Sequence, residues 1–284
     1  MKQVLNLFKL RIGVAIAFAA AAGLAVESGS GPGAGGALIL VLAVLVASAA
    51  AGAFNQYVER DLDARMGRTR NRPFVTGALR HGPAWLWLIG AMLALSVLAA
   101  AVATNPLAAL YVFLGAFTYG VVYTVWLKRR TWWNIVVGGL AGSFAVLAGA
   151  AAVSPAPGPE ALALAIVLFL WTPPHFWSLA IAYRADYAAA QVPMLPVVVG
   201  DARAARAIFA SAALLVAASL MPAAFGLGWI YLACAAAGGF VFLRRCRILV
   251  QRPARDTARA AFLASLVQLG AVLAGAMLDV ALLA

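Results

Sequence analysis

Charged residues are scarce in this 284-residue chain: they make up 11% of it, whereas hydrophobic residues make up 65%. Soluble domains carry about 25% charged residues, so the composition excludes a soluble enzyme. The mean hydropathy is +0.96. The apolar stretches are long and continuous, which excludes the alternating pattern of a β-barrel. The predicted class is therefore an all-α, polytopic membrane protein.

Cysteine and histidine are equally scarce, with two residues of each. Cys234 and Cys246 have neither a disulfide pattern nor the spacing of a metal site, and we interpret them as packing residues. His81 lies at a junction between a loop and a helix, where we expect it on the surface. His175 lies inside an apolar stretch and is the histidine of functional interest.

We expect nine spans, and basic residues occur in every second connection between them. The spans are Ile12–Val26, Ala37–Tyr57, Ala84–Ala103, Leu107–Leu127, Trp133–Val153, Ala161–Tyr183, Ala207–Phe225, Trp229–Leu243 and Ala260–Leu282. All 21 Lys and Arg residues fall in the N-terminal segment or after spans two, four, six and eight. This distribution predicts a cytoplasmic N-terminus and an outer C-terminus. The net charge of +12 thus reflects topology and contact with anionic lipid, and we expect no nucleic-acid partner.

The first polar segment, NQYVERDLDARMGRTRNRP at residues 55–73, gathers three acids and five arginines. Asn55, Glu59 and Asp63 recur every fourth residue, so a helix places them on one face, and Asp61 points elsewhere. Mg²⁺ accepts one or two carboxylates together with water and substrate phosphates, and arginines bind phosphate oxygens. The segment therefore predicts a metal–diphosphate site. The alternative is a solvated loop of balanced charges, but a polar Asn55 inside an apolar span favours a functional role.

The second polar segment begins at Tyr183 and contains Arg184 and Asp186. Asp186 is either a second contact for the metal or the diphosphate, or a loop acid paired with Arg184. The letters YRAD at 183–186 weakly echo YVERD at 57–61. This similarity is compatible with chance.

The same similarity also fits an internal repeat within one domain that spans 1–284. We expect four-helix pseudo-repeats at about 12–127 and 133–243, followed by a ninth helix, with the site between the halves.

The sequence WTPPHFW lies at residues 171–177, inside the sixth span. Pro173 and Pro174 must kink or break this helix and free backbone carbonyls. Membrane helices tolerate such a break where it lines a cavity. His175 follows, roughly 12 Å below the cytoplasmic end at about 1.5 Å per residue, with Trp177 beside it. His175 is a ligand, an acid–base group or a substrate contact, or it is a packing residue bonded to a freed carbonyl.

Two features near the middle of the chain have open roles. The basic cluster KRR at 128–130 either sets topology or helps to hold a diphosphate. Gly138, Gly139 and Gly142 allow close helix packing, which is the role we expect for them.

Three stretches together carry a resemblance to a known family. They are residues 55–73, YTVWLKRRTWWNIVVGG from Tyr123, and LFLWTPPHFW…YRADY…VPMLPVV from Leu168 to Val198. Through them the chain resembles the UbiA superfamily of intramembrane prenyltransferases from about Phe8 to Asp279, and the last stretch resembles its haem-modifying branch. The resemblance implies nine helices in the inner cell membrane around a central cavity that is open to the inner leaflet and capped by the two polar segments on the cytoplasmic side.

The resemblance also implies a reaction and its residues. A farnesyl group would pass from farnesyl diphosphate to a vinyl group of haem b with addition of water, giving haem O for terminal oxidase biogenesis, with haem A synthase or the oxidase assembly as partner. The expected metal is Mg²⁺, held by Asn55, Glu59, Asp63 and Asp186. The expected catalytic residues are these four and His175. The expected substrate contacts are Tyr57, Arg68, Arg72, Tyr123, Lys128, Arg129, Trp177 and Arg184.

The chain departs from the family pattern at three places. Glu59 stands where the family usually has Asp. The entry to the first helix reads Lys9-Leu10-Arg11 instead of Lys-Pro-Arg, which weakens any role for it. Ala190 follows four places after Asp186, so the second Asp-x-x-x-Asp of members that act on aromatic substrates is absent.

Two alternatives to the haem reaction follow from these observations. The first is a prenyltransferase for an aromatic or quinone precursor, against which the missing second motif argues. The second is a transporter or haem-handling membrane protein without catalysis, which needs no diphosphate site.

Overall fold

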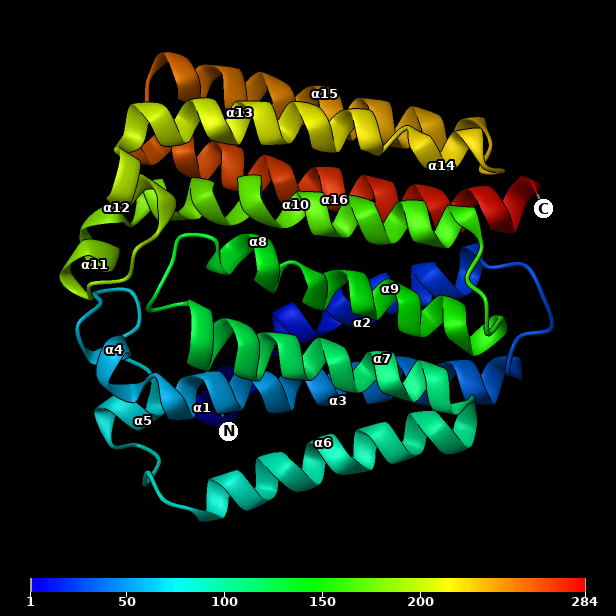
Figure 1. Ribbon diagram of the computed structural model, residues 1–284, viewed down its shortest axis with the longest axis horizontal. Coiled ribbons are helices and arrows are strands. Elements are labelled where there is room, and N and C mark those ends of the chain that lie inside the picture. Colours follow the sequence, from blue (N-terminus) through cyan, green and yellow to red (C-terminus); the bar gives the residue numbers. More distant parts are fainter. Residues whose placement is uncertain (1, 284) are drawn as a thin grey trace.

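The computed structural model describes residues 2–283, and every regular element among them is a helix. The long helices run side by side along one axis (Figure 1). They are α2 (Leu10–Val26), α3 (Gly33–Val58), α6 (Ala84–Ala103), α7 (Pro106–Phe117), α9 (Leu140–Val153), α10 (Pro159–Ala182), α13 (Asp201–Ala218), α15 (Trp229–Gln251) and α16 (Arg255–Leu283). The short helices are α1 (Lys2–Leu7), α4 (Arg60–Ala64), α5 (Pro73–Thr76), α8 (Asn134–Gly138), α11 (Arg184–Ala189), α12 (Leu195–Val199) and α14 (Met221–Ala224), and the π-helix η1 (Thr118–Leu127) continues α7.

Seven helical segments of the described chain are long and apolar enough to cross a membrane. Each of the nine expected spans overlaps a helix of the structure, and the predicted all-helical class is confirmed. Helix α2 is apolar but has 17 residues, and α15 carries Arg244, Arg245 and Arg247 in its second half. Membrane crossing by these two helices therefore stays a prediction.

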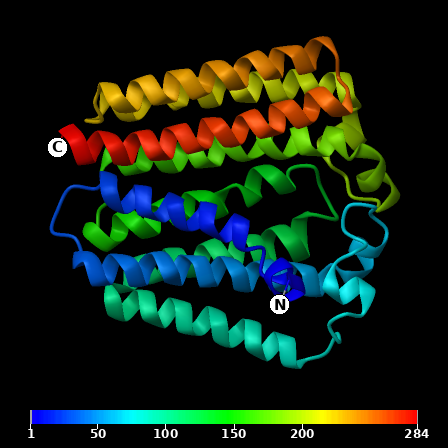
Figure 2. The same ribbon diagram turned by 180° about the vertical axis from the view of Figure 1, so that it is seen from behind.

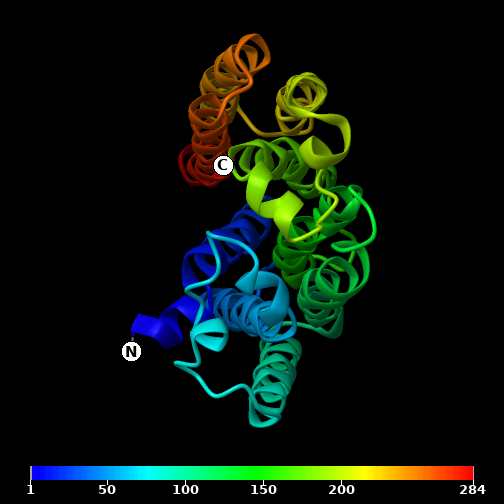
Figure 3. The same cartoon turned by 90° about the vertical axis from the view of Figure 1, so that its left-hand side faces the viewer.

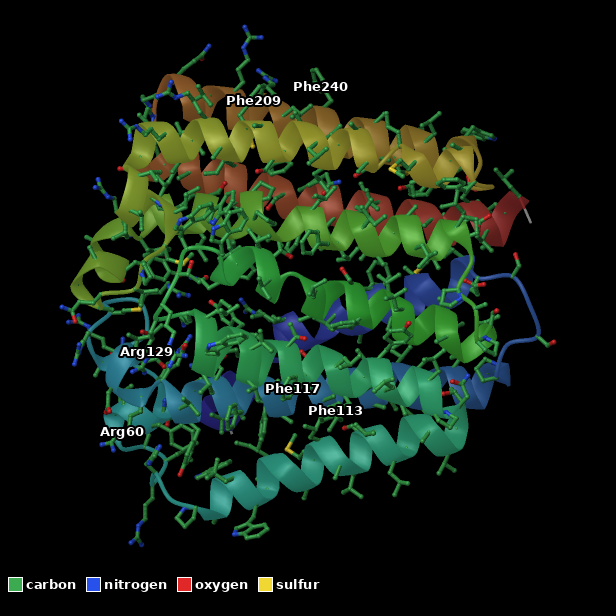
Figure 4. All side chains as sticks on the ribbon, viewed as in Figure 1. Arg60, Phe113, Phe117, Arg129, Phe209 and Phe240 are labelled. Atoms are coloured by element: carbon green, nitrogen blue, oxygen red, sulfur yellow. The ribbon has the colours of Figure 1, made fainter. Side chains whose placement is uncertain are left out.

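The outer surface of the bundle carries large apolar side chains. Phe209 and Phe240 project outward from α13 and α15 (Figure 4), and the side chain of Phe240 is 68% exposed. Trp87 of α6 is 81% exposed. Contiguous apolar surface of this kind is unfavourable in water and is what a helix presents to lipid tails.

The long helices form a ring. Contacts run from α2 to α3, through α7 and η1 to α8 and α9, and then through α10 and α16 back to α2. Seen from behind, α2 and α16 lie side by side (Figure 2). Helix α6 packs outside the ring on α3 and α7, and α13 and α15 pack outside it on α10 and α16 (Figure 3).

The two ends of the ring differ in character. Helices α4, α5, α11 and α12 gather at one end (Figure 1), which we call the polar end. Toward the other end, α2 meets α9 through Gly23 and Gly149, where an added Cβ would overlap the carbonyl groups of Val146 and Ala20. The two backbones therefore touch directly there.

Helix α10 corrects one expectation. Pro173 and Pro174 were expected to kink or break the sixth span. The break is absent, since α10 runs as one helix from Pro159 to Ala182 with both prolines inside it, and a kink stays a prediction. The prolines leave the carbonyls four residues earlier without their usual donors. Gly139 packs against one of these, since a Cβ there would lie 3.1 Å from the Phe169 oxygen. Close packing by neighbouring helices lets a membrane helix retain such prolines.

Candidate functional site

Asn55, Glu59 and Asp63 share one buried face at the polar end. Helix α3 ends at Val58 and α4 begins at Arg60, but the helical hydrogen bonds continue across Glu59. The amide of Glu59 donates to the Asn55 carbonyl at 3.0 Å, and the amide of Asp63 donates to the Glu59 carbonyl at 2.7 Å. All three side chains are at most 2% exposed. Asp61 is exposed, as its position off this face predicts.

Each side chain of this face binds one cation. The ammonium of Lys9 donates to Oδ1 of Asn55 at 2.6 Å. Lys128 donates to Oε2 of Glu59 at 2.6 Å. Arg72 donates to Oδ2 of Asp63 at 2.6 Å. Three cations therefore face two carboxylates and one amide oxygen. We call these six residues the acid–cation cluster: Lys9, Asn55, Glu59, Asp63, Arg72 and Lys128.

Two of these cations were expected at the site from the sequence, and the third, Lys9, was given little role. Arg72 and Lys128 were expected to contact a diphosphate, and they lie beside the acidic face. Lys9 corrects the expectation that the entry to the first helix has little role. It sits between α1 and α2 with φ 49° and ψ 42°, a left-handed conformation that non-glycine residues adopt at a cost of about 1–3 kcal/mol. This turn directs its ammonium into the ring, where it also donates to the Tyr119 hydroxyl at 2.9 Å.

The π-helix η1 and the residue that follows it, Lys128, present three side chains to the cluster. Tyr119 binds Lys9, Thr124 accepts from the Asn55 amide at 3.0 Å, and Lys128 binds Glu59. In an α-helix of 3.6 residues per turn, positions 119 and 124 would lie about 140° apart. The wider i→i+5 winding of a π-helix brings residues five apart nearly into line. Bonds of this spacing join Lys128 N to Tyr123 O and Thr124 Oγ1 to Tyr119 O.

Burial leaves the charges of the cluster incompletely compensated. Burial, and next the charge of Arg72, lower the pKa of Lys9 well below its usual value. Burial raises the pKa of Asp63 despite the opposing charge of Arg72. Oε1 of Glu59 is buried without a hydrogen-bond partner among residues 2–283. An orphaned carboxylate oxygen is costly, and it is the kind of donor that a hard cation or its bound water satisfies.

These donors fit a Mg²⁺ ion that shares its coordination with water and phosphate. Asn55, Glu59 and Asp63 provide oxygen atoms on one face. Residues 2–283 contain no cluster of three His, Cys, Asp or Glu side chains that would hold a metal without further ligands. The set therefore suits a metal that arrives with a diphosphate and not one held permanently by protein groups alone.

Asp186 makes no side-chain bond to the six residues of this cluster within the described chain, and its role toward the metal or the diphosphate stays a prediction. Its Oδ2 accepts the backbone N–H of Arg68 at 3.0 Å. The expected alternative pairing with Arg184 is also wrong, because Arg184 lies 3.5 Å from Asp201 instead. Asp186 thus ties the α4–α5 connection to α11.

The two tyrosines expected at the site have different surroundings. Tyr57 stacks on His81 at 4.0 Å and packs edge-on against Phe74, in a small apolar cluster beside α1 and α5. Tyr123 lies under the ammonium of Lys128, 5.6 Å from its ring centre. Tyr123, but not Tyr57, is therefore adjacent to the acid–cation cluster.

Arg129 and Arg184, two more of the expected arginines, are exposed, as Arg68 is. Arg129 lies at the polar end near the surface that also carries Arg60 (Figure 4). Arg184 is about half exposed, with a side-chain exposure of 47%. Neither belongs to the buried cluster.

His175 lies in an aromatic stack between α10 and α16. Its ring is 4.0 Å from Trp171 and 4.4 Å from Phe262 on centre-to-centre distances. Its Nδ1 is 2.6 Å from the Ser265 hydroxyl, and not from a freed carbonyl as the alternative packing role required. Because Ser265 already donates to the Phe262 carbonyl, Nδ1 carries the proton and Nε2 keeps its lone pair.

Trp177 follows on the same helix and is 5% exposed. Its ring lies 6.2 Å from that of Trp132. Its indole N–H has no acceptor among residues 2–283, so Trp177 has a free donor in a buried position.

Comparison with solved structures supports the fold independently of sequence. A digeranylgeranylglyceryl phosphate synthase superimposes with a TM-score of 0.74 over 98% of both chains at 16% identity. A UbiA homologue from Archaeoglobus fulgidus, solved with DMAPP and Mg²⁺, gives a TM-score of 0.72 over 99% of this chain and 100% of the other at 19% identity. At these identities the likeness establishes the fold alone.

Sequence comparison reaches further. Protoheme IX farnesyltransferase 2 of Paramagnetospirillum magneticum is 55% identical over 98% of this chain and 97% of its own length. Protoheme IX farnesyltransferase 1 of the same organism is 50% identical over 74% of this chain and 73% of its own. Residues 16–266 match the UbiA prenyltransferase family. A match over most of the chain, an all-helical ring of the same fold and a buried face of side-chain oxygens ringed by cations agree, and the chain belongs to the UbiA prenyltransferase family.

Proposed function

We propose that this prenyltransferase moves a farnesyl group from farnesyl diphosphate to a vinyl group of haem b, with addition of water, to form haem O. The observation that carries the proposal is the 55% identity to a protoheme IX farnesyltransferase along 98% of the chain. The acid–cation cluster supports it, because a diphosphate leaving group needs both a metal and cationic donors.

The bonds in this reaction are few. The bond between the allylic carbon of the farnesyl group and the diphosphate oxygen breaks, and both electrons leave with the diphosphate. The terminal vinyl carbon forms the new carbon–carbon bond. The electron-deficient carbon left beside the porphyrin ring takes a hydroxyl group from water, and one proton is released.

Asn55, Glu59 and Asp63 are the residues that would hold Mg²⁺. The metal, when bound, neutralises charge on the diphosphate. Lys9, Arg72 and Lys128 then exchange their present oxygen partners for diphosphate oxygens, which bind cations through strong, charge-assisted hydrogen bonds. In this proposal the cations hold the cluster together before substrate arrives and stabilise the leaving group afterwards.

The apolar residues near the cluster have a second role. An allylic cation reacts with water unless the pocket excludes it, and an aromatic face offers partial stabilisation. Tyr119 and Tyr123 stack on each other at 5.8 Å beside Lys9 and Lys128, and we propose that they supply this face. His175 is the proposed haem contact, with Nε2 free to reach iron or the edge of the porphyrin.

The proposed orientation places the cluster on the cytoplasmic side of the inner cell membrane. It rests on nine crossings and on the location of every Lys and Arg in alternate connections. Single cysteines at Arg70, Arg129, Arg203 and Arg252 should react with an impermeant reagent from the cytoplasmic side alone. Labelling of any of them from outside would overturn the nine-span arrangement. A partner that consumes haem O, such as a haem A synthase or the oxidase assembly, belongs to the same proposal.

The reaction itself is tested with purified protein, farnesyl diphosphate and Mg²⁺, offered haem b and an aromatic quinone precursor in parallel. Mass spectrometry should find a hydrated farnesyl group on haem b. Chelation of the metal should abolish the product. Prenylation of the aromatic acceptor in place of haem would assign the chain to another branch of the family.

A further inference from the structure

The left-handed turn at Lys9 joins α1 to α2. A residue other than glycine keeps this conformation only where the surrounding structure fixes it. Within the turn, the Lys9 amide donates to the Asn6 carbonyl at 3.3 Å, and the Lys9 carbonyl accepts from the Ile12 amide at 2.8 Å. Helix α1 has six residues, which is too few for a helix to be stable by itself. The position of Lys9 therefore depends on contacts from another helix.

The buried side-chain amide of Gln56 on α3 makes two such contacts. Gln56 is 1% exposed, and its Nε2 donates to the Asn6 carbonyl at 2.9 Å and to the Leu7 carbonyl at 3.1 Å. These carbonyls belong to the last turn of α1, where an α-helix provides no partner. The two bonds use both amide hydrogens of Gln56. Because both neighbours are acceptors, the nitrogen of the amide, and not its oxygen, must face α1.

Helix α3 holds Lys9 at both its backbone and its charge. Asn55 and Gln56 are consecutive, so their side chains leave the helix about 100° apart. Asn55 accepts from the Lys9 ammonium at 2.6 Å, whereas Gln56 binds the backbone that precedes Lys9. The aliphatic stem of Lys9 passes Gly52, where an added Cβ would lie 3.5 Å from the Cβ and Cδ of the lysine. One helix thus sets where the lysine begins and where its charge lies.

We infer that Gln56 is a positioning residue for the diphosphate and that it acts through Lys9. This inference rests on the proposed function, in which Lys9 exchanges Asn55 for a diphosphate oxygen. That exchange breaks the bond between Lys9 and Asn55, but it leaves the two bonds of Gln56 intact, because they go to the backbone of α1. Gln56 therefore holds the lysine before and after the substrate binds. A donor that is held in advance stabilises the leaving group without reorganisation.

A second buried glutamine provides the matched control. Gln268 on α16 is 0% exposed, and its Nε2 donates to the Ser219 hydroxyl at 3.1 Å. In both glutamines, Oε1 has no hydrogen-bond partner among residues 2–283. Within the described chain, the side chain of Gln268 makes no hydrogen bond to α1 or to the acid–cation cluster. The two residues thus share side chain and burial, and they differ in what they hold.

The first measurement is Mg²⁺-dependent binding of farnesyl diphosphate to the whole protein in detergent. Gln56→Met keeps a side chain of similar length and removes both donors, so the affinity should fall about tenfold. In a protein that already carries Lys9→Met, adding Gln56→Met should cause no further loss, because Gln56 acts through Lys9. Gln268→Met should bind farnesyl diphosphate as the parental protein does.

The second measurement is amide hydrogen exchange over residues 2–9. Exchange should become faster in Gln56→Met and stay parental in Gln268→Met, because only the first variant removes the partners of the last turn of α1. Binding of haem b should stay parental in Gln56→Met, since the proposed haem contact lies on α10. If Gln56→Met does not fold, Gln56→Asn, whose amide is one carbon shorter, replaces it in both measurements with the same expected results.

The opposite outcomes separate this inference from the proposed function. An equal loss of diphosphate affinity with and without Lys9→Met would show that Gln56 does not act through the lysine, and it overturns the inference. Parental diphosphate affinity in Gln56→Met overturns it as well. In both cases, formation of haem O by the parental protein leaves the proposed function intact. A parental protein that neither binds farnesyl diphosphate with Mg²⁺ nor forms haem O overturns both.

Discussion

In the first polar segment, the carboxylates of Glu59 and Asp63 are each 1% exposed and each binds a cation at 2.6 Å. In the second, Asp186 is half-buried and accepts a backbone N–H, and Asp201 meets Arg184 at 3.5 Å on the surface. The two segments look alike as sequence, since both contain a tyrosine shortly before a mixture of acids and arginines. They differ in burial, and burial decides what a charge can do.

The energetic consequence of this difference is large. An exposed ion pair contributes about 0–1 kcal/mol, so the second segment can lose a partner with little effect. Removing one member of a buried pair leaves a charge without compensation and costs about 3–5 kcal/mol. Each charge of the acid–cation cluster therefore stabilises its partner in the buried site. In the proposed function, a substrate that brings both a metal and an anion supplies new partners for the carboxylates and the cations together.

The largest expected effect is on magnesium-dependent binding in the first segment. Asp63→Asn should weaken Mg²⁺-dependent binding of farnesyl diphosphate by at least about a hundredfold, because it removes a charged oxygen from the metal face. Asp61→Asn, two residues away and exposed, is the matched control and should bind nearly as the parental protein does. Titration with and without Mg²⁺ measures both. Greater sensitivity at Asp61 would show that the wrong face has been assigned.

The next largest effect is expected at Lys9. Lys9→Met keeps the length of the side chain but removes the donor to Asn55 and Tyr119. Diphosphate affinity should fall about tenfold to a hundredfold, the range of supporting contacts around a metal site. Arg11→Met, exposed on α2, controls for lost charge at the same end. Equal losses in the two variants would mean that net charge, and not the position of Lys9, matters.

His175 should separate the two substrates. His175→Ala should retain magnesium-dependent diphosphate binding and lose haem O formation by at least about tenfold, the effect of one contact of about 1.4 kcal/mol. Removal of the ring from between Trp171 and Phe262 also leaves a cavity that costs about 2–4 kcal/mol of stability, so retained diphosphate affinity serves as the folding control. Parental turnover of haem b would make His175 a packing residue.

The smallest effect is expected in the second segment. Asp186→Asn should change magnesium-dependent diphosphate binding by less than about threefold, because its carboxylate lies on the Arg68 amide and outside the cluster. The same titration as for Asp63 measures it. If Asp186→Asn lost as much diphosphate affinity as Asp63→Asn, Asp186 would belong to the metal site and the two segments would not differ in function.

Local spacing predicted the part of the site that one helix builds. Asn55, Glu59 and Asp63 follow an i, i+4, i+8 pattern, and the helical register continues through Glu59, so the predicted face is the observed one. The helical spans were equally predictable from the sequence, because their apolar stretches are long and separated by turns.

The remainder depended on backbone geometry that the residue pattern does not encode. The left-handed backbone conformation of Lys9 directs its side chain inward. Neither the composition nor the periodicity of the sequence predicts such a turn. Tyr119 and Thr124 are five residues apart, a spacing that an α-helical period scatters over different faces. Asp186 sits in a segment similar to the first, but only tertiary packing shows that it binds a backbone amide.

The π-helix has a consequence for how this protein tolerates sequence change. Its ten residues present Tyr119 and Thr124, and the Lys128 that follows them, to three different partners only while their number is kept. Deleting one residue from 118–127 would favour ordinary α-winding and turn Lys128 by about 100° relative to Tyr119, away from Glu59. Substitutions at the lipid-facing Val121 and Val125, both exposed, leave that register untouched. In this segment the count of residues should be under tighter constraint than their identity, and a library of single deletions beside single substitutions across 118–127 would measure the difference.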